Sequence, residues 1–381
     1  MPRTVVKAQF CPPIKVAAIL DTWQVSGPGR QLVASARALA RHGVDLRIFM
    51  FQRTGKPPSP FAGFLAASHV QYLVLPDNGR ASISAFRQLR DALRTWNPDI
   101  IQSHGYRPNC FAYVFRRLGG NQPWLAFFHG ATAENWKVRL YHQLDRRLLL
   151  PSADIAVVMS ERDKRSFAHL REQVRVVYNA CVDLPPSTSP LPLARRDGSP
   201  VIGAVSRLSY EKGLDVLLDA LALLHSAGVP AQLSIAGDGP EQRTLERQAC
   251  ALNLREHVRF LGHVQPSTLY SQVDVVVIPS RTEGLPNVLL EALHANVPVV
   301  ATAVGAIPEV LIESAAGFMV PPEDAHSLAA AITRTLECRA EDAEPSARAR
   351  RRASQRFSLE NRVAAIVKLY AELLPNRARS T

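Results

Sequence analysis

The segment VVVIPSRTEGLPNVLLEAL, residues 275–293, joins a β-branched run to a helical pattern through a short loop. The run is typical of a buried strand in a parallel sheet, and Pro286 fits the first turn of the helix that follows. In such sheets, ligands bind beyond the carboxyl ends of the strands. We therefore expect Glu283 in the ligand-facing loop and Glu291 about one and a half turns into the helix. Backbone N–H groups at the helix start would face an anion, most simply a diphosphate, which leaves both carboxylates for sugar hydroxyls.

A second loop of the same half carries positive charge. The sequence SRLSYEKG, residues 206–213, follows an apolar run and precedes another helical pattern. Arg207 and Lys212 can both reach one diphosphate from this loop, the arginine by its planar fork and the lysine as a point charge. No Asp-x-Asp motif ends a strand in this half, so we expect these cations to take the place of a metal ion, and we expect no cofactor.

Alternating strand and helix patterns surround both loops. The helix after Gly213 illustrates the helical spacing, with apolar residues at Leu214, Leu217, Leu218, Leu221 and Leu224. Runs that predict strands cover 14–20, 46–51, 69–75, 99–104, 124–129, 155–160, 201–205, 231–237, 258–262, 273–279 and 297–302. Helical patterns between them include 31–41, 82–96 and 136–150. Such alternation predicts the α/β class, with parallel sheets covered by helices on both faces.

Length and a proline-rich segment predict two domains. A chain of 381 residues exceeds the size of a typical single core. Residues 184–200 hold five prolines among small and polar residues and are expected to link a first domain, 1–183, to a second, 201–356. The helical pattern of 357–373 follows a complete second domain, so we hypothesise that it packs back on the first.

The charge of the chain is unevenly divided. The net charge is +12, with 47% apolar and 20% charged residues, which is typical of a globular protein. Residues 1–190 hold 25 Lys and Arg against 12 Asp and Glu, whereas the remainder holds 20 against 21. The basic first half suits an anionic membrane surface or an acidic acceptor. We expect no nucleic acid partner, because the sequence contains no aromatic and basic motif of a known binding module.

Cysteine usage and hydropathy predict a cytoplasmic protein. The five cysteines are scattered and contain no C-x-x-C pair, so we interpret them as reduced. The apolar run 14–20 is interrupted by Lys15 and is too short for a signal peptide. No stretch reaches the 18 apolar residues expected of a membrane span. Peripheral binding to the inner face of the cell membrane is the alternative to a freely cytoplasmic location.

Three features of the second half together resemble family 4 of the retaining glycosyltransferases, which has the GT-B fold. They are the two glutamates eight residues apart, Arg207 with Lys212, and the sequence GDGP at 237–240. The resemblance covers essentially the whole chain. It implies two Rossmann-like, doubly wound domains that face a central cleft, the first for the acceptor and the second for a nucleotide-sugar donor.

The resemblance also implies roles for individual residues. Glu283 would contact the donor sugar and is the first catalytic candidate. Gly284 and Leu285, which follow it, are expected in the same donor-binding loop. Glu291 would hold the ribose of the nucleotide, and the Arg/Lys pair would hold the diphosphate.

The first half resembles the family through weaker motifs. The sequence SGPGR, residues 26–30, resembles the family's glycine loop, so Gly27 and Gly29 are expected close to the donor diphosphate. His129 matches a histidine that lines the catalytic cleft and is the second catalytic candidate. His104 is a fainter match to another histidine, and we leave open whether it is a core residue or functional.

The chain departs from the family pattern at several glycines. Asn296 replaces a glycine after the second glutamate, and the expected Gly-Gly pair is Gly305-Ala306. Asparagine tolerates left-handed backbone angles, so we expect the first loop to keep its conformation. A common Asn-Gly turn is Asn179-Ala180 here, which affects backbone geometry and no chemistry.

We hypothesise that the chain transfers a hexose, with retention, from a UDP- or GDP-sugar to a hydroxyl acceptor. A glycan or a lipid-linked precursor in lipopolysaccharide, exopolysaccharide or other surface glycan synthesis is the expected acceptor. Two alternatives stay open. One is a nucleotide-sugar epimerase of the same fold, and the other is a sugar-binding protein without catalysis.

Overall fold

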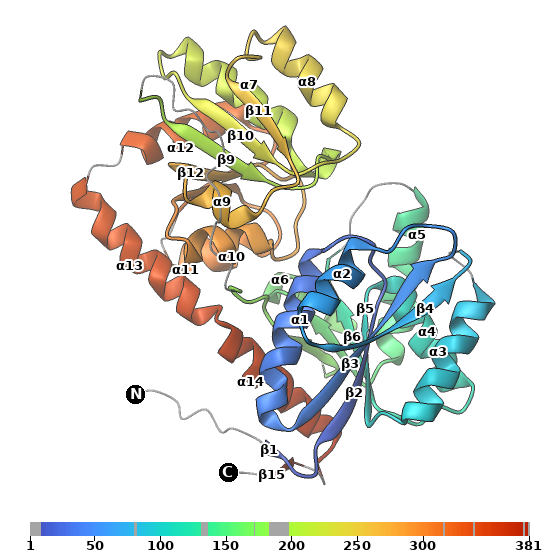
Figure 1. The fold of residues 1–381 in the computed structure, drawn as a ribbon. Coiled ribbons are helices and arrows are strands. Elements are labelled where there is room, and N and C mark those ends of the chain that lie inside the picture. The colour runs from blue at the N-terminus through green and yellow to red at the C-terminus, as the bar shows by residue number, and fades with distance from the viewer. Residues whose placement is uncertain are drawn as a thin grey trace. The chain divides into compact units, whose positions relative to one another are not determined.

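The chain folds as two compact units, each a sheet with its own helices, in the computed structural model shown in Figure 1. The structure describes residues 9–79, 82–130, 136–170, 172–182, 198–314, 317–337, 340–375 and 378–379. Of these, the first unit contains 9–130, 136–180 and 358–379, and the second contains 181–357. Most of the expected linker, 184–197, lies outside the described residues.

The first unit is built on a parallel sheet of seven strands in the order β4-β3-β2-β5-β6-β7-β8. Its strands are β2 (Ile14–Leu20), β3 (Val44–Arg53), β4 (Gln71–Asp77), β5 (Ile100–His104), β6 (Trp124–Phe128), β7 (Ile155–Val158) and β8 (Val174–Val176). The chain moves outward in both directions from β2 and β5, so the carboxyl ends of these two strands form the switch point at which such sheets bind ligands. A separate short pair joins β1 (Gln9–Phe10) to β15 (Ala378–Arg379).

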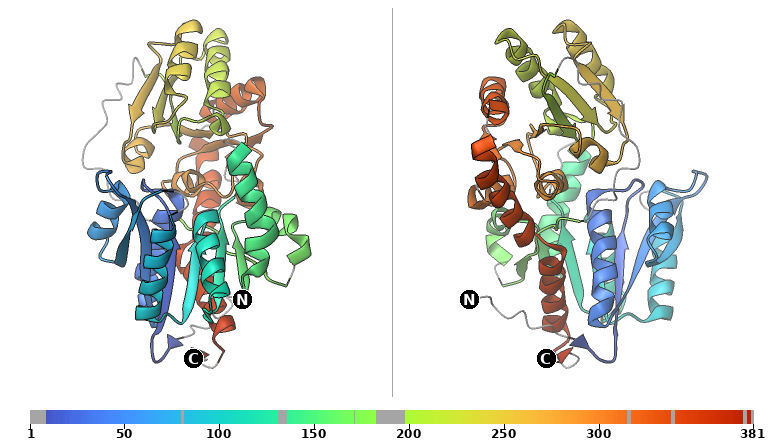
Figure 2. Two further views of the ribbon diagram at one scale, coloured as in Figure 1. Left: turned by 90° about the vertical axis from the view of Figure 1, so that its right-hand side faces the viewer. Right: turned by 60° about the vertical axis from the view of Figure 1, so that its left-hand side comes forward.

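Helices cover both faces of this sheet (Figure 2). They are α1 (Gly27–Leu39), α2 (Pro60–Ala67), α3 (Ile83–Trp96), α4 (Tyr106–Arg117), α5 (Trp136–Leu144), α6 (Glu161–Ser166) and α14 (Leu359–Leu373). Leu89 of α3 and Phe115 of α4 are buried in one cluster with Phe49 of the sheet. Each such side chain contributes about 1.5 to 3 kcal/mol when it leaves water.

The last helix of the chain belongs to the first unit. Helix α14 packs on α1, and Ser358 caps it by accepting a hydrogen bond from Asn361 N–H at 3.3 Å. Its buried Arg362 donates from Nη1 to Tyr178 O at 2.6 Å and from Nε to Ser35 Oγ at 3.2 Å. These bonds attach α14 to α1, through Ser35, and to the segment that follows β8, through Tyr178.

The second unit is built on a parallel sheet of six strands in the order β11-β10-β9-β12-β13-β14. Its strands are β9 (Val201–Val205), β10 (Gln232–Ala236), β11 (Val258–Gly262), β12 (Val275–Ile278), β13 (Val299–Thr302) and β14 (Gly317–Val320). Its helices are α7 (Leu214–Ser226), α8 (Gln242–Ala251), α9 (Pro266–Tyr270), α10 (Asn287–His294), α11 (Ile307–Ser314), α12 (Ala325–Glu337) and α13 (Ala340–Arg356). The leucine stripe predicted on α7 is buried in the core of this unit. Strands β9 and β12 form its switch point.

The boundary between the two units lies a few residues earlier in the sequence than predicted. Residues 181 and 182, expected in the first domain, belong to the second unit. Cys181 explains the difference, because its N–H donates to Phe357 O at 2.6 Å and its thiol lies 3.3 Å from Leu290 O. Both partners lie in the second unit.

The helix expected over 136–150 is interrupted. Helix α5 ends at Leu144, a π-helical turn follows at Asp145–Leu149, and a short 3₁₀ turn follows at Leu150–Ser152. The wider turn buries the carboxylate of Asp145, which accepts a hydrogen bond from Asn109 Nδ2 at 2.7 Å, together with Leu149 and Leu150. Sequence periodicity alone does not reveal such an inserted turn.

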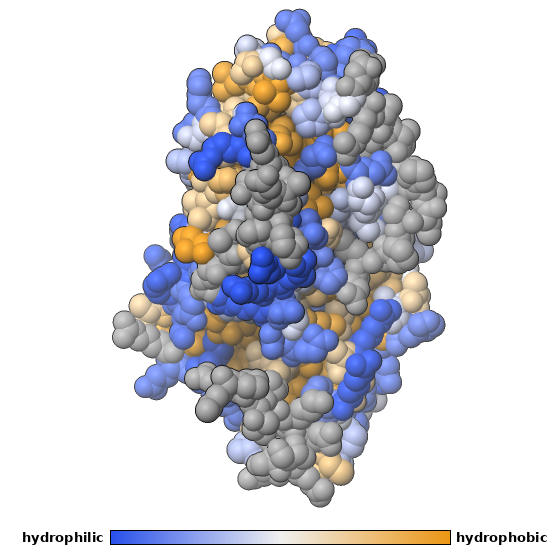
Figure 3. All heavy atoms as spheres, turned by 90° about the vertical axis from the view of Figure 1, so that its left-hand side faces the viewer, coloured by the Kyte–Doolittle hydropathy of each residue, from blue (hydrophilic) through white to orange (hydrophobic). Residues whose placement is uncertain are grey.

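The C-terminal half of α13 presents a hydrophilic surface (Figure 3). Arg348, Arg351 and Arg352 are exposed on it, whereas Arg350 is buried and donates from Nε to Asn296 Oδ1 at 2.9 Å. Asn296 has a φ of 60°, as expected of an asparagine that replaces a glycine. Among the residues described, no helix combines the length and the apolar composition that crossing a membrane requires.

Candidate active site

The two predicted ligand loops of the second unit follow β9 and β12 and touch one another. Arg281 N–H donates to Glu211 O at 2.9 Å, which joins the two backbones directly. A Cβ on Gly213 would lie 2.1 Å from Pro279 O, and Gly213 has a φ of 62°. Only glycine satisfies both the left-handed backbone and this close approach. The fold therefore brings residues 206–213 and 279–286 together at the switch point.

The turn at 237–240 packs against the loop of residues 206–213. A Cβ on Gly237 would lie 1.9 Å from Ser206 O, and one on Gly239 would lie 2.3 Å from Leu208 O. Leu208 N–H also donates to Asp238 O at 2.8 Å. The two glycines are thus needed because the loop that carries Arg207 rests directly on their backbone.

Lys212 and Glu283 form an ion pair across the two loops. Lys212 Nζ lies 2.7 Å from Glu283 Oε1, and both side chains are largely shielded from solvent. Ser280 Oγ donates to the same carboxylate oxygen at 2.7 Å. Among the described residues, Oε2 of Glu283 accepts no hydrogen bond. The carboxylate is therefore held by one oxygen while the other is available to a ligand hydroxyl.

Arg281 fixes the loop that carries Glu283. Its guanidinium donates two hydrogen bonds to Asp215, at 2.8 and 2.7 Å, and one to Glu323 at 3.0 Å. It also stacks over the ring of Tyr210, 4.0 Å from the centroid. Hydrogen bonds to Asp215 are the main cause that raises the pKa of Arg281. These bonds join the loop to Asp215 in the first turn of α7.

Arg207 pairs with Glu211 four residues on, at 2.5 Å. Burial raises the pKa of Glu211, but hydrogen bonds from Ser209 and Arg207 outweigh it, and the net pKa is lowered. The arginine side chain is nevertheless 45% exposed. The half-exposed guanidinium is within reach of an arriving anion.

Glu291 lies inside α10 and is buried. Its Oε2 accepts a hydrogen bond from Tyr270 Oη at 2.9 Å, and Tyr270 is the last residue of α9. Pro286 is the N-cap of α10 and not part of its first turn, which corrects the sequence-based expectation. The tyrosine holds the carboxylate in one rotamer, and a fixed carboxylate is suited to a pair of hydroxyls.

The residues that follow Glu283 are packed rather than solvated. Gly284 O accepts a hydrogen bond from Ala306 N–H at 2.8 Å, and Leu285 is buried. A Cβ on Gly305, which has a φ of 58°, would lie 2.3 Å from Glu283 O. Alanine at 306 is compatible with this packing because its N–H still makes the bond. The loss of the second glycine therefore leaves the loop intact.

Two histidines lie at the carboxyl edge of the first sheet. His104 ends β5, and His129 follows β6 directly. His104 Nδ1 lies 2.9 Å from His129 Nε2, and the rings are stacked. Burial and then the charge of Arg362 lower the pKa of His129 to about 3. Burial, then His129 and then Arg362 lower the pKa of His104 well below its usual value. Both rings are therefore neutral at pH 7.

A chain of hydrogen bonds sets the tautomers of these histidines. Tyr370 Oη of α14 donates to Gln102 Oε1 at 2.6 Å, and Gln102 Nε2 lies 2.7 Å from His104 Nε2. The nitrogen of the Gln102 amide can only donate, so His104 Nε2 accepts and the proton of His104 lies on Nδ1. That proton is donated to His129 Nε2, which places the proton of His129 on Nδ1. The C-terminal helix thereby determines which nitrogen of His129 can donate to a ligand.

Replacing Tyr370 with phenylalanine should release this constraint. Gln102 Oε1 loses its donor, so the amide can turn over and both histidine tautomers become populated. The ¹⁵N chemical shifts of the imidazoles in selectively labelled protein report this, and stability should fall by about 1 to 3 kcal/mol for the unsatisfied acceptor. Tyr72→Phe, at an exposed phenol, is the matched control. A single unchanged tautomer in Tyr370→Phe would refute the relay.

Gly27 and Gly29 lie in a helix rather than in a preceding loop, which corrects the sequence-based expectation. Ser26 caps α1 by accepting from Gly29 N–H at 3.3 Å, and Pro28 favours an early helix start. A Cβ on Gly29 would lie 2.7 Å from Phe61 Cε2. Packing against α2 therefore contributes to the need for glycine at this position. The first turn of α1 follows the carboxyl end of β2.

The structure places the predicted residues in two groups. Arg207, Lys212, Glu283 and Glu291 gather at the second switch point, and His129 stands at the edge of the first sheet. Sequence reasoning missed Tyr270, Gln102 and Tyr370, which position these side chains. No motif marks them, because each acts across a sequence gap that only the fold closes.

The sequence of each unit matches a known family. The family model described as Glycosyltransferase Family 4 matches residues 25–183, and that described as Glycosyl transferases group 1 matches residues 190–355. The chain is 34% identical over 144 residues to alpha-D-kanosaminyltransferase of Streptomyces kanamyceticus, which covers 37% of either protein. It is 30% identical over 249 residues to the putative colanic acid biosynthesis glycosyltransferase WcaL of Escherichia coli K12. That match covers 61% of this chain and 60% of WcaL.

A solved structure shares the fold. The crystal structure of Anabaena Alr3699/HepE in complex with UDP and glucose has a TM-score of 0.78 and 22% sequence identity, over 94% of this chain and 100% of that one. The prediction of an α/β protein with two Rossmann-like units of GT-B type is confirmed. Since models of this class match both units, the chain belongs to the group 1 glycosyltransferases, of the family 4 type.

Proposed function

We propose that the chain transfers a hexose from a nucleoside-diphosphate sugar to a hydroxyl acceptor, with retention of configuration and without a metal ion. The observation that carries the proposal is the contact of 2.7 Å between Lys212 Nζ and Glu283 Oε1 at the switch point. This contact places Lys212, a cation that can bind a diphosphate, beside Glu283, a carboxylate that can bind a sugar hydroxyl. The Anabaena structures contain UDP with glucose or UDP-glucose, which supports a nucleoside-diphosphate sugar donor. The proposed donor is a UDP- or GDP-sugar.

The donor diphosphate would replace the internal partners of two cations. Arg207 turns from Glu211, and Lys212 shares its charge between Glu283 and the β-phosphate. The first turn of α10 supplies backbone N–H groups to the same anion. Glu291, fixed by Tyr270, accepts from the ribose hydroxyls. These groups stabilise the diphosphate as it leaves, which is the work that a metal ion performs in other sites.

Glu283 Oε2 accepts from a hydroxyl of the transferred hexose, and His129 stays the second catalytic candidate. The bond from the anomeric carbon to the β-phosphate oxygen breaks, and the bond to the acceptor oxygen forms on the same face. The proton of the acceptor hydroxyl passes to the departing phosphate oxygen. Because no carboxylate has to attack the sugar, this front-face route is consistent with Glu283 being held by Lys212 and Ser280.

The acceptor is proposed to be a surface glycan or its lipid-linked precursor, as in exopolysaccharide or lipopolysaccharide synthesis, with the protein in the cytoplasm or on the inner membrane surface. The likeness to WcaL, named for colanic acid biosynthesis, supports this class. The positive net charge of residues 1–190 supports an anionic surface or acceptor.

A thermal-shift screen with UDP-, GDP-, ADP- and TDP-sugars tests the donor class. One nucleotide series should raise the melting temperature with the logarithm of its concentration. At a concentration of 100 times Kd the ligand should stabilise the folded protein by about 2.7 kcal/mol. The matching nucleoside without phosphates should give a smaller shift. If no nucleotide sugar stabilises the protein at millimolar concentration, the proposed function is wrong.

A further inference from the structure

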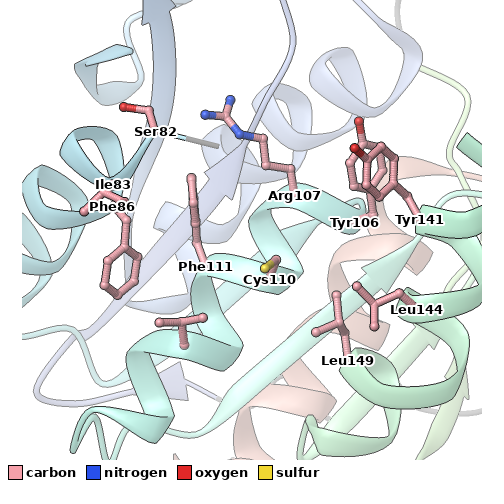
Figure 4. A pocket seen from close by; sticks show the side chains of 11 residues that line it. Ser82, Ile83, Phe86, Tyr106, Arg107, Cys110, Phe111, Tyr141, Leu144 and Leu149 are labelled. Atoms are coloured by element: carbon pink, nitrogen blue, oxygen red, sulfur yellow. The ribbon is translucent and has the colours of Figure 1, made fainter. Parts of the chain in front are cut away.

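The first unit contains an apolar pocket that the proposed chemistry does not use (Figure 4). Its volume is about 390 Å³, and it lies between residues of α3, α4 and the segment from α5 through the π-helical turn. The apolar side chains that line it include Phe86, Phe111, Val114, Leu144 and Leu149. This volume falls in the range of pockets that bind small molecules.

The one cation in the lining is already neutralised. Arg107 donates to Asp21 at 2.8 Å and to Asp77 at 3.0 Å. Its Nε is sealed from solvent, so a ligand in the pocket does not reach it. Because two carboxylates already balance its charge, Arg107 offers an anionic ligand little attraction. The mostly apolar lining therefore suits a hydrocarbon chain.

Two residues of the pocket lining, Tyr106 and Arg107, follow His104 closely in the sequence. Helix α4 starts at Tyr106, two residues after His104, and Tyr106 stacks on Tyr141 with centroids 5.0 Å apart. Both tyrosines line the pocket. A chain bound in it would carry its polar end toward the carboxyl edge of the first sheet.

A ridge of exposed leucines continues outward from the pocket. Leu140, Leu144 and Leu148 recur every four residues and are 56%, 44% and 41% exposed. Leu144 also lines the pocket. Exposed apolar residues that gather in this way mark interaction sites, whereas scattered ones do not. A hydrocarbon chain longer than the pocket could lie along this ridge.

We propose that this pocket binds the hydrocarbon chain of an amphiphilic acceptor. A nucleotide does not fit, because the one cation of the lining is already paired with two carboxylates and most of the lining side chains are apolar. The inference rests on the proposed function and deepens it, since it selects a lipid-linked acceptor over a free glycan.

Binding of n-alkyl β-glucosides, each below its micelle concentration, tests the proposal. From hexyl to decyl, affinity should rise about fourfold per methylene in the wild type, by the transfer free energy of a CH₂ group. Val114→Trp fills the pocket and should abolish the chain-length dependence. Leu144→Ser, at a half-exposed position that folding tolerates, should weaken decyl glucoside binding about tenfold, which is the loss of one to two methylene contacts.

Two leucine variants provide the controls. Leu118→Ser removes an exposed leucine outside the pocket, and Leu148→Ser changes the ridge without touching the lining. The first should bind like the wild type, and the second should lose at most threefold. An absence of chain-length dependence in the wild type would overturn the proposal. An equal loss in Leu148→Ser and Leu144→Ser would also overturn it, since the ridge would then act alone as a membrane surface.

The outcome is separable from that of the proposed function. Nucleotide stabilisation is read on the second unit, and alkyl glucoside binding is read on the first. If nucleotide binding persists while chain length has no effect, the pocket inference fails and the transferase proposal stands. If binding depends on chain length while no nucleotide sugar binds, the pocket binds hydrocarbon chains and the transferase proposal fails.

Discussion

Glu283→Gln should reduce sugar transfer by about 10²- to 10³-fold, the loss seen when one preorganised electrostatic group is removed from an active site. Glutamine keeps an oxygen for Ser280 Oγ and for Lys212 Nζ but carries no charge. The substitution therefore tests the charge of the carboxylate while it keeps the geometry of the loop. Initial rates of nucleoside diphosphate release at saturating donor measure the effect.

The control for this variant is Glu246→Gln, on the exposed face of α8. It should transfer at the wild-type rate. Donor affinity of Glu283→Gln should stay within about fivefold of the wild type, because its main loss lies in the transition state. A variant with normal turnover would remove Glu283 from the catalytic group.

Lys212→Ala should weaken binding of the nucleoside diphosphate by about 10- to 100-fold, the value of a hydrogen bond to a charged group. Binding of the nucleoside alone should not change, because the lysine faces the phosphates and Glu291 with Tyr270 holds the ribose. Titration calorimetry with both ligands separates the two effects. Lys212→Arg should retain most of the affinity.

The pair should also be non-additive. Lys212 and Glu283 are in contact, so each single change already breaks the ion pair. The double variant Lys212→Ala, Glu283→Gln should therefore lose less activity than the product of the two single losses. Strictly multiplicative losses would show that the two groups act independently, contrary to the geometry.

The donor side could be predicted from sequence because its residues lie in two short loops. Glu283 follows β12 within five residues, and Lys212 follows β9 within seven. A parallel sheet brings the ends of neighbouring strands to one edge, so the local pattern was enough. Asn296 was predicted to adopt a left-handed conformation for a similar reason, since the preference is a property of the residue itself.

The positioning residues could not be predicted. Tyr370 bonds to Gln102 across 268 residues, and Tyr270 bonds to Glu291 from a different helix. Strands β8 and β14, which the sequence did not reveal, have three and four residues and show little periodicity. The π-helical turn at Asp145–Leu149 contains Asp145, whose buried carboxylate accepts from Asn109, 36 residues earlier in the chain. Each of these features is decided by tertiary packing rather than by local preference.

The central claim is that this chain breaks the bond between the anomeric carbon and the diphosphate. The most direct test incubates the wild type with the stabilising nucleotide sugar and no acceptor, and follows the anomeric protons by NMR. Water should act as a poor acceptor, so nucleoside diphosphate and free sugar should appear slowly, with the donor's anomeric configuration in the first-formed sugar. An intact donor with an inverted sugar carbon would instead indicate an epimerase, and a bound donor that never changes, even when alkyl glucoside is added, would indicate a sugar-binding protein.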